Sequence, residues 1–95
     1  MKKNVAGQKI LIAATTTGDA ANITATISKD GGAFGATDTT HPTEIGNGYY
    51  YFPLTQAETN CDILVLHPVS STSGVEIRDV VMYPETQVYA WVRTA

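Results

Sequence analysis

The chain has 95 residues, of which 43% are hydrophobic and 16% charged, and its formal net charge is −3. This length predicts one domain with a single small core and no deep cleft, and the six scattered basic residues form no stripe that follows a nucleic-acid backbone. No apolar run approaches the ~20 residues that span a bilayer or forms a signal-peptide core, and the single cysteine excludes an intrachain disulfide.

Short strands and turns are predicted along the first half of the chain. "QKILIAA" (residues 8–14) is a short apolar run, and "ITATIS" (23–28) alternates apolar and polar residues with the period of a half-buried strand. "KDGG" (29–32) predicts a tight turn, because its Asp30–Gly31 pair tolerates positive φ. "AFGAT" (33–37) is then the returning strand of a hairpin, and a short pairing is expected near residues 43–45 in the loop that follows.

The second half contains three further predicted strands. "YYYFPL" (49–54) is rich in aromatic residues, and Pro53 indicates an edge or an end of pairing. "DILVLHPV" (62–69) is almost continuously apolar and fits a central strand, and "VEIRDVVMY" (75–83) is expected as the last long strand. The chain therefore predicts an all-β fold: an antiparallel immunoglobulin-like or jelly-roll-type sandwich of about 6–8 strands, with one short helical turn near residues 55–60.

The helical turn rests on "LTQAETNCD" (54–62), where Thr55 and Glu58 have the S/T-x-x-E spacing of a capping box. Asn60 suits the end of such a turn because it tolerates the left-handed conformation. A catalytic interpretation of Cys61 would require a base beside it, and no histidine stands in a recognisable signature around it. We therefore interpret Thr55, Glu58, Asp30 and Gly31 as structural and Cys61 as a buried, unreactive thiol.

No metal or cofactor site is expected. The aspartates do not form the D-x-D-x-D-G run of a calcium loop, and Asp38 with its neighbouring threonines fits a solvated loop better than a weak cation site. His41 and His67 lack the spacing of zinc ligands, and the serines at 70–73 have no visible base partner. The sequence thus favours a protein that is not an enzyme.

Two aromatic segments are candidate contact surfaces. Alternation places Tyr49 and Tyr51 on one face of their strand, where they are either a candidate platform for a glycan or ordinary cross-strand packing.

The other aromatic segment is "PETQVYAWVRTA" (84–95), in which apolar and large polar or aromatic side chains alternate. Its candidate interface residues are Val88, Tyr89, Trp91 and Arg93, and tyrosine, tryptophan and arginine are the types enriched at hot spots. The domain organisation expected is an N-terminal arm (1–7), a sandwich (8–83) and a C-terminal segment (84–95) that is either a binding arm or a final edge strand with Trp91 in the core.

Six further motifs stand along the chain: Gly-Asp-x-x-Asn-Ile-Thr (18–24), Ile-Ser-Lys-Asp-Gly-Gly (27–32), Pro-Thr-Glu (42–44), Gly-Tyr-Tyr (48–50), Leu-Thr-x-Ala-Glu-x-Asn (54–60) and Pro-Val-Ser-Ser-Thr-Ser-Gly (68–74). In these motifs the chain resembles, over roughly residues 5 to 83, a module of virion proteins of tailed bacteriophages. It implies a structural protein of the virion, assembled in the host cytoplasm.

Within that class, the small size, the absence of recognisable chemistry and the arm-like termini favour a capsid decoration, or cement, protein. Its expected partners are the major capsid protein or another virion protein and further copies of itself, with a homotrimer favoured and neither nucleic acid nor membrane. The alternative is a tail, baseplate or fibre module with a receptor- or glycan-binding role.

Overall fold

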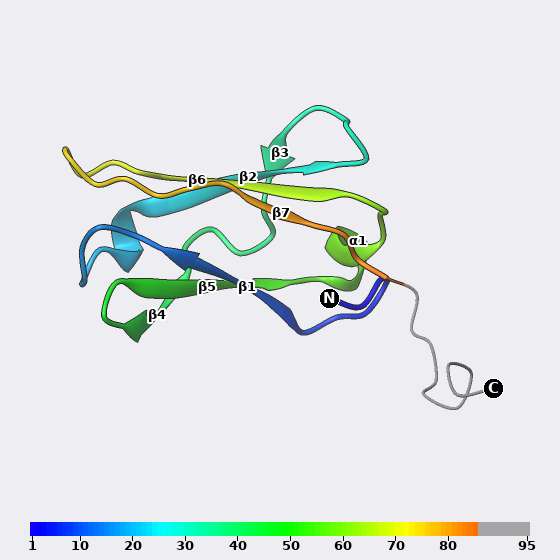
Figure 1. Ribbon diagram of the computed structural model, residues 1–95, viewed down its shortest axis with the longest axis horizontal. Coiled ribbons are helices and arrows are strands. Elements are labelled where there is room, and N and C mark those ends of the chain that lie inside the picture. Colours follow the sequence, from blue (N-terminus) through cyan, green and yellow to red (C-terminus); the bar gives the residue numbers. More distant parts are fainter. Residues whose placement is uncertain (86–95) are drawn as a thin grey trace.

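The fold is a two-layer β-sandwich, seen in a computed structural model that describes residues 1–85 (Figure 1). One sheet has the order β1-β5-β4 and consists of β1 (Gln8–Ala13), β4 (Thr43–Gly46) and β5 (Tyr49–Leu54). The other has the order β3-β2-β6-β7 and consists of β2 (Ile23–Lys29), β3 (Gly35–Ala36), β6 (Leu64–Ser70) and β7 (Val80–Met82). All pairings within the sheets are antiparallel, so the predicted all-β antiparallel sandwich is confirmed.

The strand order is that of an immunoglobulin-like sandwich from its second strand onward. If β1 is counted as strand B, the two sheets read B-E-D and C′-C-F-G, and the chain changes sheet at the same three connections. Two short helical turns accompany the strands: a 3₁₀ turn (Ala20–Asn22) before β2, and α1 (Gln56–Thr59) between β5 and β6. Within residues 1–85 no strand occupies the place of strand A, beside the outer edge of β1.

The core lies between the inward-facing residues of the two sheets, as the alternation in the sequence predicts. In β2 every second residue from Ile23 to Ile27 is buried, and in β5 Tyr50, Phe52 and Leu54 are buried while their neighbours are not. The buried hydrophobic residues are Ile10, Ile12, Ile23, Ala25, Ile27, Tyr50, Phe52, Leu54, Cys61, Leu64 and Leu66.

The hairpin turn between β2 and β3 has the predicted chemistry. Asp30 and Gly31 both have positive φ, at 53° and 78°, and the N–H of Gly32 donates to the carbonyl of Lys29 at 2.9 Å. The Asp30 carboxylate also accepts from the N–H groups of Asp62 and Ile63, at 2.8 and 3.0 Å. The turn therefore holds the start of β6 as well as reversing the chain.

Pro53 lies in β5, the central strand of its sheet, and ends the hydrogen-bond ladder between β5 and β4. Because the N–H of Ala14 donates to the carbonyl of Gly48, even-numbered residues along β5 direct their backbone groups toward β1 and odd-numbered ones toward β4. The missing N–H of Pro53 therefore lies on the β4 side, just beyond the last pair, Thr43 with Tyr51. Pro53 marks an end of pairing, one of the two places that the sequence indicated.

Pro68 has the same effect on β6, and it explains why the predicted strand 75–83 is wrong. The N–H of Ser71 donates to the carbonyl of Asn22, so even-numbered residues of β6 face β7. Continuing the β6–β7 register past Leu66 and Val80 would require an N–H from Pro68, which proline lacks. Pairing with β6 is therefore confined to Val80–Met82.

The chain before β7 pairs with the other sheet instead. Ile77 forms an isolated antiparallel bridge with Ala14, and the N–H of Thr15 donates to the carbonyl of Glu76 at 3.3 Å. Residues 76–77 therefore lie at the end of β1, and the chain then crosses to pair with β6 as β7 (Figure 1).

The two ends of the described chain meet beside α1. Lys2 and Glu85 form a parallel bridge, in which the N–H of Glu85 donates to Met1 and the N–H of Lys3 donates to Glu85. The sequence suggested that the chain leaves the domain at Pro84. Pro84 is instead buried and Glu85 is bridged to Lys2, so the chain stays in contact with the domain through Glu85.

Candidate interaction surface

The outer side of the three-stranded sheet carries a group of exposed apolar and aromatic side chains. Leu11 and Tyr49 are 57% and 51% exposed, Ile45 in the β4 bulge is 58% exposed, and Tyr51 is half-buried. Leu11 is the direct cross-strand partner of Tyr51, and the Lys9 ammonium lies 4.8 Å from the centroid of the Tyr51 ring. We call Lys9, Leu11, Ile45, Tyr49 and Tyr51 the outer tyrosine face.

The structure brings together on this face the two tyrosines that the sequence singled out. Tyr50, between them, points the other way: its hydroxyl donates to the carbonyl of Thr16 at 2.9 Å and accepts from the N–H of Asp19 at 3.1 Å. The face is built on three paired strands, so its side chains are held on a rigid surface. Sequence reasoning missed Leu11 and Ile45, although the alternation in "QKILIAA" already placed Leu11 opposite the buried Ile10 and Ile12.

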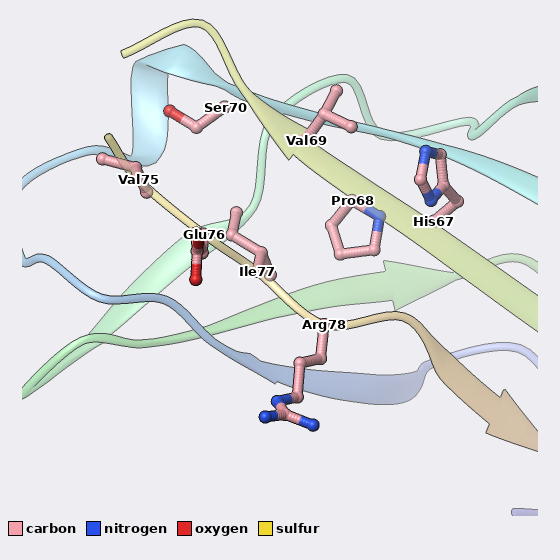
Figure 2. A pocket seen from close by; sticks show the side chains of 8 residues that line it. All are labelled: His67, Pro68, Val69, Ser70, Val75, Glu76, Ile77 and Arg78. Carbon is pink, nitrogen blue, oxygen red and sulfur yellow. The ribbon is translucent and has the colours of Figure 1, made fainter. Parts of the chain in front are cut away.

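A shallow depression of about 490 Å³ lies elsewhere, where β6 and the chain before β7 diverge (Figure 2). Its lining residues are His67, Pro68, Val69, Ser70, Val75, Glu76, Ile77 and Arg78. His67 Nδ1 lies 2.6 Å from Asp79 Oδ1, with both side chains about half exposed, and Phe34 packs edge-on against the imidazole. The depression follows from the missing N–H of Pro68, and a half-exposed contact such as that between His67 and Asp79 contributes little to stability.

Ser70, one of the serines considered at the sequence level, has a structural partner. Its hydroxyl donates to the Asp19 carboxylate at 2.5 Å, and the same carboxylate accepts from Asn22 at 2.9 Å and from Thr72 at 2.7 Å. These bonds, led by that from Ser70, hold the pKa of Asp19 below its ordinary value. The serine thus joins the β6 end to the loop before β2 and has no free hydroxyl to act as a nucleophile.

The hydrogen-bonded carboxylates of Asp19 and Asp30 are expected to make the free energy of unfolding depend on pH in the acid range. The pKa of Asp30 is also lowered, chiefly by the N–H groups of Ile63 and Asp62. A lowered folded-state pKa gives a stabilising contribution that is complete above the ordinary carboxyl pKa of about 3.9 and is lost as pH falls below that value and through the lowered pKa. Urea unfolding between pH 6 and pH 3 is expected to show a loss of stability that is smaller in Asp19→Asn and Asp30→Asn, but unchanged in the exposed-site control Asp38→Asn. Equal slopes in all four proteins would contradict this.

The predicted capping box is present at the start of α1. The N–H of Thr55 donates to Glu58 Oε1 at 2.8 Å, and the N–H of Glu58 donates to Thr55 Oγ1 at 3.2 Å. The second oxygen of Glu58 accepts from the N–H of Asp38 at 3.0 Å, a contact that local spacing could not indicate. Glu58 is buried and used structurally on both oxygens.

Cys61 is buried, and burial is the main cause that raises the pKa of its thiol. We expect a thiol reagent to label native Cys61 much more slowly than an introduced exposed cysteine, and at the same rate once the chain is unfolded. The matched control is Val69→Cys in a Cys61→Ser background, because Val69 is 47% exposed. Rapid labelling of the native wild-type protein would contradict an unreactive thiol.

Val88, Tyr89, Trp91 and Arg93 lie outside the described residues. Among residues 1–85, no group of three or more histidine, cysteine, aspartate or glutamate side chains is arranged to hold a metal ion, and no helix is long and apolar enough to cross a bilayer. Comparisons with protein-family models, curated proteins and solved structures found no match to this chain.

Proposed function

We propose that this chain is a structural protein of a bacteriophage virion, and within that class a capsid decoration protein that binds the assembled shell as an oligomer. The observation that carries the proposal is the outer tyrosine face, which presents Leu11, Ile45 and Tyr49 to solvent on a rigid sheet. Exposed apolar and tyrosine side chains of this kind are typical of the centre of a protein–protein interface. The sequence resemblance described above supplies the class of partner.

A binding role fits the use of the polar side chains better than catalysis does. The carboxylates of Asp19, Asp30 and Glu58 accept backbone or side-chain hydrogen bonds that hold loops in place. Within residues 1–85 every buried side-chain nitrogen or oxygen has a hydrogen-bond partner. These groups therefore serve the fold, and the surface is left to provide the function.

The test is co-sedimentation of the purified protein with phage shells that lack it. Leu11→Glu should abolish binding by placing a charge in the centre of the face, whereas Val69→Glu, at a similarly exposed position on the outer side of the other sheet, should leave binding intact. Circular dichroism of both variants controls for folding. Shell binding that survives Leu11→Glu would remove the face from the interaction.

The copy number in purified virions distinguishes a location on the capsid from the alternative location in the tail, baseplate or fibre. A shell decorator is expected in hundreds of copies, on the order of the number of shell sites, and a tail or fibre module in far fewer. For the second location a glycan-binding role has one supporting observation, which is that Tyr49 and Tyr51 share an outer face. Binding to a glycan array that is lost in Tyr49→Ala and Tyr51→Ala would favour it.

A further inference from the structure

In the part of the chain that the structure describes, no strand pairs with the outer edge of β1 along most of its length. Even-numbered residues of β1 direct their backbone groups toward β5, so those of Lys9 and Leu11 point away from the sheet. Within residues 1–85, neither residue has a strand beside it on that side. β1 is the edge strand of its sheet, and the bridge from Ala14 to Ile77 lies beyond the end of β1. An open edge of this kind is a template for another strand.

The core is incompletely covered on the same side of the sandwich. Ile77 is bridged to Ala14 at the end of β1 and leads into β7, so the open edges of β1 and β7 lie on one side. Met1, Ile77, Val80 and Met82 pack against the core there and are only partly buried. A strand added beside β1 with one apolar face would cover them.

The N-terminal residues do not fill this place, because they are engaged elsewhere. Lys3 donates its backbone N–H to Glu85, Asn4 donates to the carbonyl of Thr59, and Val5 exchanges hydrogen bonds with the hydroxyl of Thr59. Gly7 then leads directly into β1. The strand that an immunoglobulin-like order would place beside β1 must therefore come from another part of the chain or from another molecule.

We propose that residues 86–95 of a second copy of this chain form that strand on the β1 edge. The segment has Val88, Ala90 and Val92 at alternate positions, which is the pattern needed to cover an apolar side of the core. Tyr89, Trp91 and Arg93 would then lie on the same outer side as Leu11, extending the outer tyrosine face.

Length and direction favour a second copy over the same chain. The ten residues after Glu85 reach at most about 33–36 Å when extended, and the six residues of β1 span about 20 Å. Glu85 follows β7 to the end of the domain where β1 begins (Figure 1), so pairing within one chain would require an immediate reversal. Thr86 and Gln87 are not among the residue types that favour such a reversal.

Donation from each copy to the next is a head-to-tail contact, and where the rotation between copies closes, it gives a ring in which every β1 edge is filled. The inference deepens the proposed function by naming the contact between copies, but it concerns self-association alone. Its tests use the purified full-length protein without shells, so its failure is distinguishable from failure to bind a shell.

The first test uses two variants. One blocks the acceptor edge of β1, and the other blocks the donated segment. Leu11→Pro removes an outward N–H without removing a bond to β5, and Val88→Asp with Val92→Asp places charges on the apolar side of the donated strand. In sedimentation velocity the wild type should form oligomers and each variant alone should be monomeric. A mixture of the two should recover a two-chain species, because one retains its donor segment and the other its acceptor edge.

The matched control is Val81→Pro, which places a proline at an outward-facing position of β7, an edge strand of the other sheet, and should not affect assembly. A mixture that stays monomeric would overturn the proposal, as would a wild type that is monomeric.

The second test does not depend on the folding of the proline variant. Leu11→Cys protein is mixed with Tyr89→Cys, Trp91→Cys or Arg93→Cys protein, each in a Cys61→Ser background, and oxidised. A disulfide between copies is expected for at least one pairing with Leu11→Cys and for none with Val69→Cys. If no pairing with Leu11→Cys gives a disulfide between copies, or if Val69→Cys gives as much, exchange between copies is wrong.

Discussion

Phe52→Ala is expected to lower the free energy of unfolding by about 3–5 kcal/mol, the usual loss for a fully buried phenylalanine. The side chain is completely buried and pairs across the strands with Ile10, which is also buried. A domain of this size has a total stability of only about 5–15 kcal/mol, so the variant should be partly unfolded at moderate temperature. Urea unfolding followed by circular dichroism measures the difference.

Tyr51→Ala is the control, because it removes an aromatic ring of similar size from the next position of the same strand. Tyr51 is half-buried on the outer tyrosine face, and we expect its loss to cost about 1 kcal/mol through the contacts with Leu11 and Lys9. A shift of the β5 register by one residue would exchange the two results. Similar losses for both variants would show that the inward and outward faces of β5 have been assigned incorrectly.

The second large effect is expected at Glu58. Glu58→Ala should cost about 1–3 kcal/mol, because it leaves the N–H groups of Thr55 and Asp38 without their acceptor at a partly buried site. Thr55→Ala removes only the cap and should cost about 0.5–2 kcal/mol. Thermal unfolding of the two single variants and the double variant measures both losses and their coupling.

Glu58→Gln distinguishes the hydrogen bonds from the charge. The amide keeps one acceptor oxygen, so its stability should fall between those of the wild type and Glu58→Ala. If Glu58→Ala were no less stable than Thr55→Ala, the bond from Glu58 to the 38–40 loop would not contribute. None of these substitutions at Thr55 and Glu58 alters the outer tyrosine face, so every variant that folds should retain shell binding.

Local patterns predicted those elements whose structure is set by residues close in sequence. The alternation of Ile23, Ala25 and Ile27 needs no distant partner to indicate a half-buried strand, and the Asp30–Gly31 turn and the Thr55–Glu58 cap are each complete within four residues. These predictions are confirmed. The aromatic alternation in β5 likewise placed Tyr49 and Tyr51 on a common face before the sheet was known.

Long-range register could not be predicted in the same way. The segment 75–83 has the composition of one strand, but its partner changes because Pro68, ten residues from Arg78, directs its missing N–H toward that segment. Which side of β6 a proline faces depends on the pairing with β2, and the sequence does not give that pairing. The same limit applies to Glu58 with Asp38 and to Asp19 with Ser70, contacts between residues 20 and 51 positions apart.

The bridge between Lys2 and Glu85 has a consequence for how the domain can be joined to other chains. The first and last residues of the described fold lie side by side. If the domain were inserted into a loop of a host protein, the two ends of that loop would need to be separated by little more than the distance between neighbouring strands. By the same geometry, a short linker between these ends would permit a circular permutant with new termini in the exposed loop at Ser71–Gly74. The fold is thus suited to insertion within a longer polypeptide as well as to existence on its own.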